Sequence, residues 1–135
     1  MRSPETKAAL NIPDDRTWAP CSGINYKRLP QASQFLYEDL IASGIRIAHY
    51  GGDTDGQVPM LGTQEWIYAM DLDLVEEWRP WMVDDWHLGG YIERREGIDL
   101  ITIHGAGHMV PQWKRFETRL GLMKWIHNEE LPKQK

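Results

Sequence analysis

The chain has 135 residues, which is enough for one domain of ordinary size. Its formal net charge is -5, from 15 basic and 20 acidic residues. Charges of both signs are scattered along the chain, so no basic run indicates nucleic-acid binding and no basic amphipathic helix indicates a membrane surface. No apolar stretch approaches the roughly 20 residues that a bilayer-spanning helix needs. Residues 1–15 contain no apolar core segment, so they are not a signal peptide; either the chain is not exported on its own, or the export signal is expected on another segment.

The N-terminal third of the chain predicts little regular structure. Residues 1–30 carry four prolines and little periodicity, with one short helix expected over 4–10. Residues 31–43 place four apolar side chains at helical spacing, and Gly44 follows where a helix C-cap would fall. Residues 45–50, IRIAHY, alternate as a buried strand does, and the strand is expected to end at Gly51-Gly52.

The rest of the chain continues the alternation of helices and strands. The polar turn formers of 53–59 predict a loop, and Thr63 is expected to cap a helix over 63–70. The acidic, tryptophan-rich stretch 71–86 predicts a loop with a short helix. Residues 89–97 and 98–105 predict two strands around a turn at Glu96-Gly97, the second of them interior. Residues 115–130 predict an amphipathic helix whose apolar face carries Phe116, Leu120, Met123 and Ile126 or His127.

The cysteine and tryptophan content bears on whether the chain contacts another segment. The single cysteine, Cys21, excludes an internal disulfide, and two interpretations stay open: a free thiol, most often a buried apolar one, or half of a bond to another chain. Seven tryptophans are many for one small domain to cover, although tryptophan is highly buried on average. We therefore expect some of them to pack against a partner segment.

The order of elements predicts an α/β architecture. Two of the predicted strands end in polar loops that contain glycine, and in open α/β sheets that edge is where ligands bind. The first loop offers Asp53 and Asp55, and the second offers His108. An acid after one strand and a histidine after a later strand is the chain order of an α/β-hydrolase triad, in which the nucleophile comes first.

Two motifs resemble the serine carboxypeptidases, a family with the α/β-hydrolase fold. Gly52-Asp53-Thr54-Asp55, with Pro59 and Gly62-Thr63 after it, matches the family pattern around its acid, and 105–111, GAGHMVP, matches the pattern around its histidine without a mismatch. WAPCSGINY at 18–26, the acidic tryptophan stretch before GGY, and ELP near the end are also similar to the family. The resemblance implies one partial domain over 1–135, the C-terminal part of an α/β-hydrolase fold: strand, Asp loop and helix, then hairpin strand, His loop and helix.

The resemblance also implies roles for five residues. Asp55 corresponds to the triad acid and His108 to the triad base. Met109 corresponds to a residue lining the pocket for the leaving C-terminal residue, and Val58 to a position near the pocket for the residue before it. Cys21 corresponds to a cysteine that bonds to the family's N-terminal half.

The chemistry of these residue types agrees with the implied roles. A serine hydroxyl needs a base within about 3 Å, and an imidazole oriented by a buried carboxylate can take its proton and pass it to the leaving amine. Asp53 has a plainer expected role, which is to accept turn backbone N–H bonds and hold the loop. The other histidines, 49, 87, 104 and 127, are expected to be structural or exposed to solvent. A metal site built from the two aspartates with His104 and His108 lacks a ligand-spacing signature, so no metal or cofactor is expected.

The triad nucleophile is the residue that the sequence does not supply. No Gly-x-Ser-x-Gly pattern occurs, and the four serines, Ser3, Ser22, Ser33 and Ser43, all precede the first predicted strand. Three explanations stay open: a subunit of a processed two-chain enzyme, a partial product of a longer gene, or a short protein without catalysis that serves as an interaction or scaffold module. The leading expectation is a carboxypeptidase segment that acts on peptide C-termini only with a nucleophile-bearing half and is inactive alone. The resemblance implies the secretory pathway, a vacuole or lysosome, or the extracellular space.

Overall fold

The computed structural model describes residues 3–19, 23, 25–27 and 34–134. The chain divides into two compact units, Met1–Ala32 and Ser33–Lys135. In the first unit the predicted N-terminal helix is confirmed as α1 (Pro4–Ala9). The Ser3 hydroxyl caps it by accepting a hydrogen bond from the Thr6 N–H at 3.2 Å, and Pro4 stands in the first turn, where no N–H is needed. Cys21 lies outside the described residues.

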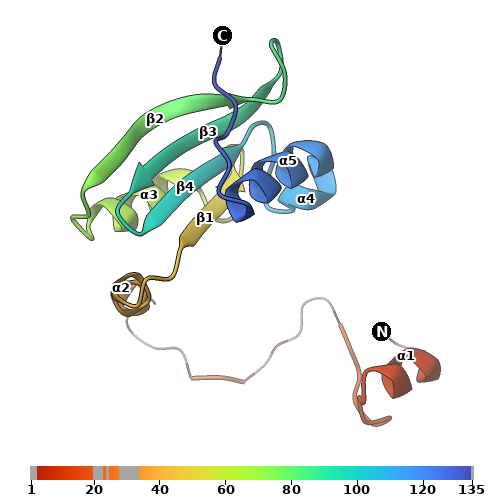
Figure 1. The fold of residues 1–135 in the computed structure, drawn as a ribbon. Coiled ribbons are helices and arrows are strands. Elements are labelled where there is room, and N and C mark those ends of the chain that lie inside the picture. The colour runs from red at the N-terminus through yellow and green to blue at the C-terminus, as the bar shows by residue number, and fades with distance from the viewer. Residues whose placement is uncertain (1–2, 20–22, 24, 28–33, 135) are drawn as a thin grey trace. The chain divides into compact units, whose positions relative to one another are not determined.

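The second unit is built on a four-stranded sheet with the order β1-β4-β3-β2 (Figure 1). Its strands are β1 (Ile47–Gly52), β2 (Leu74–Met82), β3 (Leu88–Arg95) and β4 (Ile98–Ile103). β1 and β4 run parallel, while β4 with β3 and β3 with β2 are antiparallel. The parallel pair places Gly52 opposite Ile103, so both strands deliver the chain to the same edge of the sheet.

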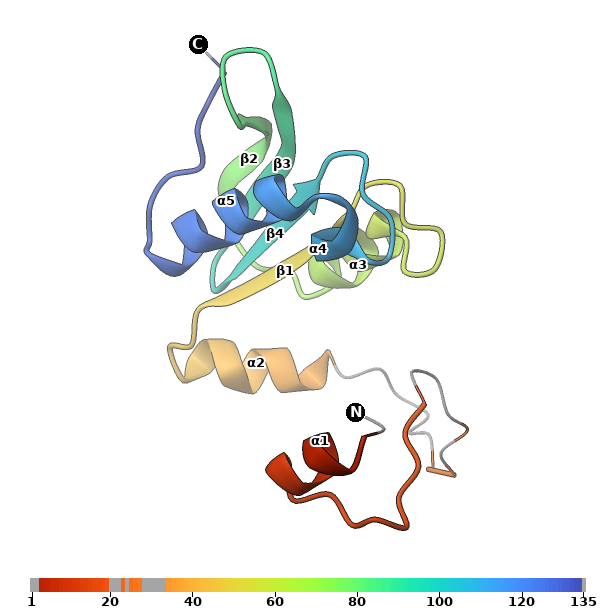
Figure 2. The same ribbon diagram turned by 90° about the vertical axis from the view of Figure 1, so that its right-hand side faces the viewer.

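Helices cover both faces of this sheet. The helices of the unit are α2 (Phe35–Ala42), α3 (Met60–Tyr68), α4 (Val110–Trp113) and α5 (Arg115–Ile126), and Figure 2 shows α5 and α3 on opposite sides of the strands. Successive side chains of a strand point to opposite faces, so β4 contributes to two cores. Ile101 and Ile103 pack with Trp81 and α5 residues, whereas Leu100 packs with Ile67 of α3.

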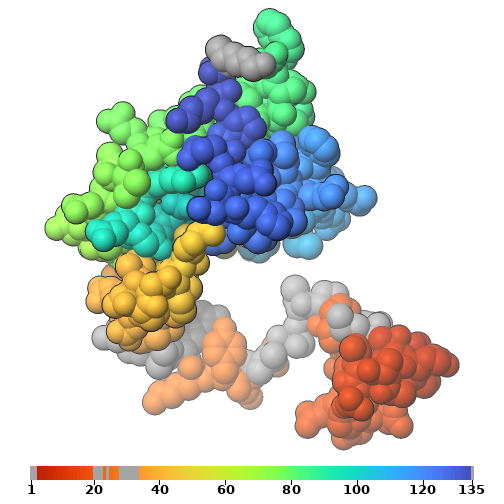
Figure 3. All heavy atoms as spheres, viewed as in Figure 1, coloured from red at the N-terminus to blue at the C-terminus, as the bar shows by residue number. Residues whose placement is uncertain are grey.

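The segment after α5 completes the face that α5 covers. Leu131 is buried in the same core as Trp81, and the Met82 N–H donates a hydrogen bond to the Pro132 carbonyl at 2.8 Å. The space-filling view shows the atoms of α5 and this segment packed against the sheet (Figure 3). The mixed α/β architecture predicted from the sequence is therefore confirmed.

Several predicted boundaries are wrong, and 71–86 has the wrong type. Residues 74–82 of that stretch form strand β2, which pairs with β3. Glu76 lies 2.7 Å from Arg79 and 3.3 Å from Arg94 of β3, whereas Glu77, Asp84 and Asp85 are exposed. β1 begins two residues later than predicted and continues through both glycines. α3 begins at Met60 after Pro59, so Thr63 lies buried within the helix and does not cap it. The short helix α4 is an addition.

The predicted apolar face of α5 is wrong for three of its residues. Phe116, Met123 and Ile126 are exposed, whereas Leu120 packs against the core, and the buried residues of the helix are Glu117, Thr118 and Gly121. Gly121 lies over Trp81, where a β-carbon would be 3.4 Å from the ring, so the side of the helix with small residues faces the sheet. The helix leaves a large apolar surface uncovered.

The tryptophans are covered unequally, as their number predicts. Trp81 is fully buried, while Trp86, at the tip of the β2–β3 hairpin, is 95% exposed. Trp18 and Trp113 are exposed as well. The described part of the chain therefore does not bury all of its tryptophans.

Candidate active site

Two loops meet at the edge where the parallel strands end. Residues 53–59 follow β1 and residues 104–109 follow β4. The Thr54 N–H and its hydroxyl both donate to the Ala106 carbonyl, at 3.0 and 2.8 Å. Gly52 makes this approach possible, because a β-carbon there would lie 2.0 Å from the Ala106 carbonyl oxygen. The glycine-rich strand end thus holds the two loops against each other.

Asp55 and His108 lie together at the contact between these loops. The Asp55 Oδ2 and the His108 Nδ1 are 3.0 Å apart. The Asp55 side chain is only 8% exposed, whereas the His108 side chain is 54% exposed. The other ring nitrogen of His108, Nε2, has no hydrogen-bond partner among the described residues and is open to an incoming group. The pair therefore combines a buried carboxylate with an accessible imidazole.

Backbone amides also hold the Asp55 carboxylate. Its Oδ1 accepts hydrogen bonds from the Gln57 N–H at 2.7 Å and the Val58 N–H at 3.2 Å. The hydrogen bond from His108 lowers the pKa of Asp55 most; partial burial opposes this, and the two amides lower the pKa further. Asp55 is thus held as a carboxylate, the form that orients and charges a neighbouring imidazole.

A second aspartate–histidine pair lies beside the first. The Asp53 Oδ2 is 2.6 Å from the His104 Nδ1, and its Oδ1 accepts the Gly105 N–H at 2.7 Å. Asp53 thus accepts a backbone N–H at a turn, as expected, and this turn belongs to the opposite loop. Within the Asp loop, Asp55 binds the turn amides instead. The sequence held a signal for this pair: Asp53 and His104 are the first residues after two neighbouring parallel strands.

A cavity of about 260 Å³ adjoins the Asp55–His108 pair. Val58 lines it, whereas Met109 is exposed and is not one of the lining residues. Burial lowers the pKa of His49, which also lines the cavity, and its Nε2 lies 3.4 Å from the Thr63 hydroxyl. The full lining is His49, Tyr50, Gly51, Asp55, Val58, Met60, Thr63, His108, Val110 and Pro111.

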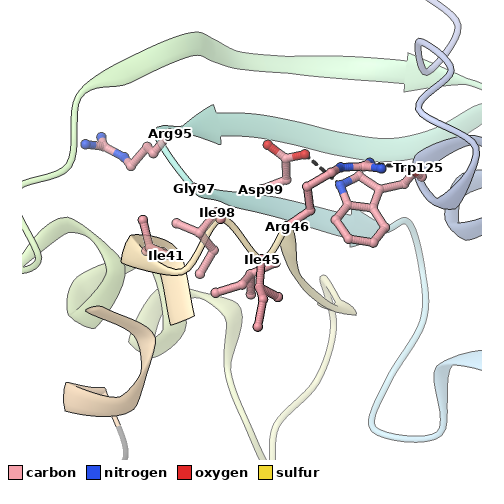
Figure 4. A pocket seen from close by; sticks show the side chains of 10 residues that line it. Ile41, Ile45, Arg46, Arg95, Gly97, Ile98, Asp99 and Trp125 are labelled. Atoms are coloured by element: carbon pink, nitrogen blue, oxygen red, sulfur yellow. Dashed lines mark hydrogen bonds between the residues drawn. The ribbon is translucent and has the colours of Figure 1, made fainter. Parts of the chain in front are cut away.

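A cavity of about 200 Å³ lies at the other end of the strands, where Arg46 leads into β1 (Figure 4). The Trp125 indole N–H donates to the Asp99 carboxylate at 2.6 Å, and Arg46 stacks over the Trp125 ring at 4.5 Å. Burial raises the pKa of Asp99, against the hydrogen bond from Trp125. No histidine, serine or cysteine lines this cavity, and its polar groups are engaged with one another. The carboxyl edge of the sheet is therefore the better candidate for chemistry.

Among the described residues, no group of three or more His, Cys, Asp or Glu side chains is placed to hold a metal ion. None of the described helices has the length and apolar character needed to cross a membrane.

Comparison with known proteins gives consistent similarities. The sequence model of the family described as serine carboxypeptidase matches residues 1–128. Serine carboxypeptidase-like 26 of Arabidopsis thaliana is 38% identical over 138 residues, which cover 98% of this chain and 30% of that protein. Serine carboxypeptidase II-1 of Hordeum vulgare is 39% identical over 98 residues, which cover 70% of this chain and 30% of that protein.

The fold is also similar to a solved structure. A prohormone-processing carboxypeptidase from Saccharomyces cerevisiae aligns with a TM-score of 0.66 at 19% identity, over 94% of this chain and 30% of that one. This likeness confirms the expected fold class. The chain spans about a third or less of the length of these proteins.

Proposed function

The chain belongs to the serine carboxypeptidase family, and from this premise we propose that it supplies the acid and the base of a serine-type carboxypeptidase. The observation that carries the proposal is the Asp55–His108 pair, with 3.0 Å between Oδ2 and Nδ1, at the carboxyl ends of adjacent parallel strands. A buried acid, an accessible imidazole and a cavity beside them are what a hydrolytic triad requires of two of its members.

The proposed reaction uses the free nitrogen of His108. Its Nε2 takes the proton of a serine hydroxyl as the serine oxygen attacks the last peptide carbonyl of a substrate. The same proton passes to the amine of the C-terminal residue as the carbon–nitrogen bond breaks and leaves an acyl-enzyme. Water, deprotonated by Nε2, then cleaves the ester and restores the serine. Asp55 keeps the Nδ1–H directed toward itself and stabilises the charged ring in each half of the reaction.

We propose that the serine comes from a segment outside these 135 residues. The Ser3 hydroxyl is occupied with Thr6 at the start of α1, and the Ser43 hydroxyl donates to the Leu40 carbonyl at 2.8 Å. Ser22 and Ser33 lie outside the described residues, and neither stands in a Gly-x-Ser-x-Gly motif. The chain by itself is accordingly expected to be inactive.

Substrate contacts are assigned to two residues on the Asp and His loops. Val58 lines the cavity beside His108 and is proposed to contact the residue before the scissile bond. Met109 follows His108 directly and is exposed, and it is proposed to contact the leaving residue. The substrates are peptide or protein C-termini, and the compartment proposed from the family is the secretory pathway, a vacuole or lysosome, or the extracellular space.

The test restores the triad in two pieces. The chain is co-expressed with the upstream, serine-bearing part of an Arabidopsis relative, and release of the C-terminal residue from a blocked dipeptide is measured. We expect His108→Ala to lower turnover by about 10⁴-fold or more. His127→Ala is the matched control, since His127 is exposed at the end of α5 and is expected to leave turnover unchanged. Full turnover in the His108→Ala complex would contradict the assignment.

A serine-directed phosphonate probe tests the missing nucleophile separately. The probe should label the upstream segment of the complex and leave this chain unlabelled. Labelling of the chain alone would show that it carries its own nucleophile. A stable complex that neither reacts with the probe nor hydrolyses the dipeptide would favour the second candidate, a non-catalytic interaction module, for which the exposed apolar residues Trp86, Trp113 and Phe116 are the supporting observation.

A further inference from the structure

We propose that Asp53 and His104 form a positioning pair that fixes the register of the His loop against the Asp loop, and so sets the Asp55–His108 hydrogen bond. The proposal rests on the role given to His108 above. Asp53 and His104 touch no reacting atom in it; they act through the loop that carries His108.

Both oxygens of Asp53 bind the opposite loop. Oδ2 lies in hydrogen-bond contact with the His104 Nδ1 at 2.6 Å, and Oδ1 accepts a hydrogen bond from the Gly105 N–H at 2.7 Å. Gly105 has a φ of +67°, in the left-handed region, so this carboxylate holds the residue at which the chain turns. One side chain thus fixes both the last residue before the turn and the turn itself.

The part of the His loop that follows has few other restraints. Thr54 binds the Ala106 carbonyl through its N–H and its hydroxyl, at 3.0 and 2.8 Å. The backbones of Gly107 and His108 make no hydrogen bond with any described residue. The His108 ring is held from both sides of the loop. Before it, residues 104–106 are anchored to the Asp loop and, through the His104 N–H, to the Gly89 carbonyl at 2.8 Å; after it, the Val110 side chain is buried. Asp53 supplies two of the anchors that join this loop to the Asp loop.

Sequence spacing keeps the two pairs mechanically coupled. Asp53 precedes Asp55 by two residues and His104 precedes His108 by four, with the Thr54–Ala106 contact between the pairs. Loss of the Asp53 anchors frees the His loop to shift relative to Asp55. A shifted ring loses the hydrogen bond that selects its Nδ1–H tautomer, so the tautomer of His108 reports on the register of the loops.

The experiment measures this tautomer in the 135-residue chain by ¹⁵N NMR of the histidine rings at about pH 8, above the range in which an ordinary histidine titrates. We expect Asp53→Ala to lower the ratio of Nδ1–H to Nε2–H His108 about fivefold, the change that follows from losing one ordinary hydrogen bond. Asp53→Asn keeps an oxygen for Gly105 and an amide for His104, so it should restore most of the ratio.

Asp84→Ala is the matched control. Its carboxylate also accepts two backbone N–H bonds, from Trp86 and His87 at 2.9 Å each, but in the β2–β3 hairpin. An equal ratio in Asp53→Ala, Asp84→Ala and the unsubstituted chain would overturn the proposal. If Asp53→Ala loses its amide dispersion, His104→Ala decides instead, because it keeps the Gly105 bond, and an unchanged ratio there overturns the proposal as well.

The same spectra separate this proposal from the proposed function. An unsubstituted chain in which His108 shows no excess of the Nδ1–H tautomer would remove the Asp55–His108 pair and both proposals with it. A normal ratio that Asp53→Ala does not change would overturn only the positioning role. A reduced ratio in the variant supports the positioning pair, whatever the outcome of the turnover experiment.

Discussion

At the scale of single residues, the two loop aspartates do different work with the same chemistry. Asp55 accepts hydrogen bonds from two amides of its own turn and from one histidine. The two turn amides hold its carboxylate independently of His108. Asp53 binds only groups of the opposite loop. Asp55 hydrogen-bonds the ring of His108, whereas Asp53 joins the Asp loop to the backbone of the His loop.

The pKa of Asp55 gives a direct test of its contact with His108. Since the hydrogen bond from His108 is the largest influence lowering this pKa, we expect His108→Ala to raise it toward the ordinary value near 3.9, with the two turn amides still lowering it in part. Titration of the Asp55 carboxyl carbon by NMR measures the change, with His127→Ala as control. The same pKa in all three proteins would show that the contact does not form in solution.

The lowered pKa has a defined consequence for stability. A carboxyl whose pKa is lower in the folded chain than in the unfolded chain stabilises the fold above the unfolded value, about 3.9. That contribution declines as pH falls through the folded pKa. Asp99 has the opposite sign, because burial raises its pKa and its ionisation as pH rises reduces the free energy of unfolding.

At the scale of secondary-structure elements, β4 organises the second unit. It pairs with β1 on one side and β3 on the other, and it contributes side chains to the cores on both faces of the sheet. Trp81 of β2 fills the core under α5, and its indole N–H donates to the Thr102 carbonyl at 3.1 Å. α5 therefore packs on a core that is centred on Trp81.

Substitutions of Trp81 and Trp86 test this packing. We expect Trp81→Ala to lower the free energy of unfolding by about 3–5 kcal/mol, because it leaves a cavity in the core and removes the indole hydrogen bond to the Thr102 carbonyl. Trp86→Ala, at a side chain that is 95% exposed, should change it by less than about 0.5 kcal/mol. Urea unfolding followed by circular dichroism measures both. Similar losses in the two variants would contradict the assignment of Trp81 to the core.

At the scale of the whole molecule, two facts stand together: the chain matches only part of the length of its relatives, and it exposes large apolar side chains. It spans 30% of the length of its Arabidopsis relative, and several large apolar side chains of α5 are exposed, among them Phe116, Met123 and Ile126. Exposed apolar area of this kind commonly marks a contact with another protein segment. The proposed serine-bearing segment is the partner that the catalytic argument requires.

Cys21 provides a test of this partnership. We propose that its thiol forms a disulfide with the serine-bearing segment, which accounts for the odd cysteine count. Intact mass of the co-expressed complex under non-reducing conditions should show the chain joined to that segment, and reduction should separate them. Cys21→Ser should abolish the linked species. A complex of unlinked chains would show that Cys21 is a free thiol.

The sequence alone predicted the fold class, which is confirmed, and singled out Asp55 and His108, which the structure brings together. Its motifs are local: the residues around Asp55 and His108 are contiguous, and the strand before each loop has a readable pattern. A sequence spacing cannot measure a distance, however, and the 3.0 Å contact depends on the parallel pairing of β1 with β4, about fifty residues apart in the chain.

Only the tertiary structure decided which residues face inward and which polar groups find partners. Part of the acidic stretch, 74–82, is a strand because it pairs with β3, where Arg94 lies 3.3 Å from Glu76. On α5, Gly121 and Leu120 pack toward the Trp81 core, while Phe116, Met123 and Ile126 are exposed. The Asp53–His104 pair likewise exists because parallel pairing aligns two strand ends. Each of these outcomes rests on contacts between distant segments, and such contacts leave no periodicity in the sequence that encodes them.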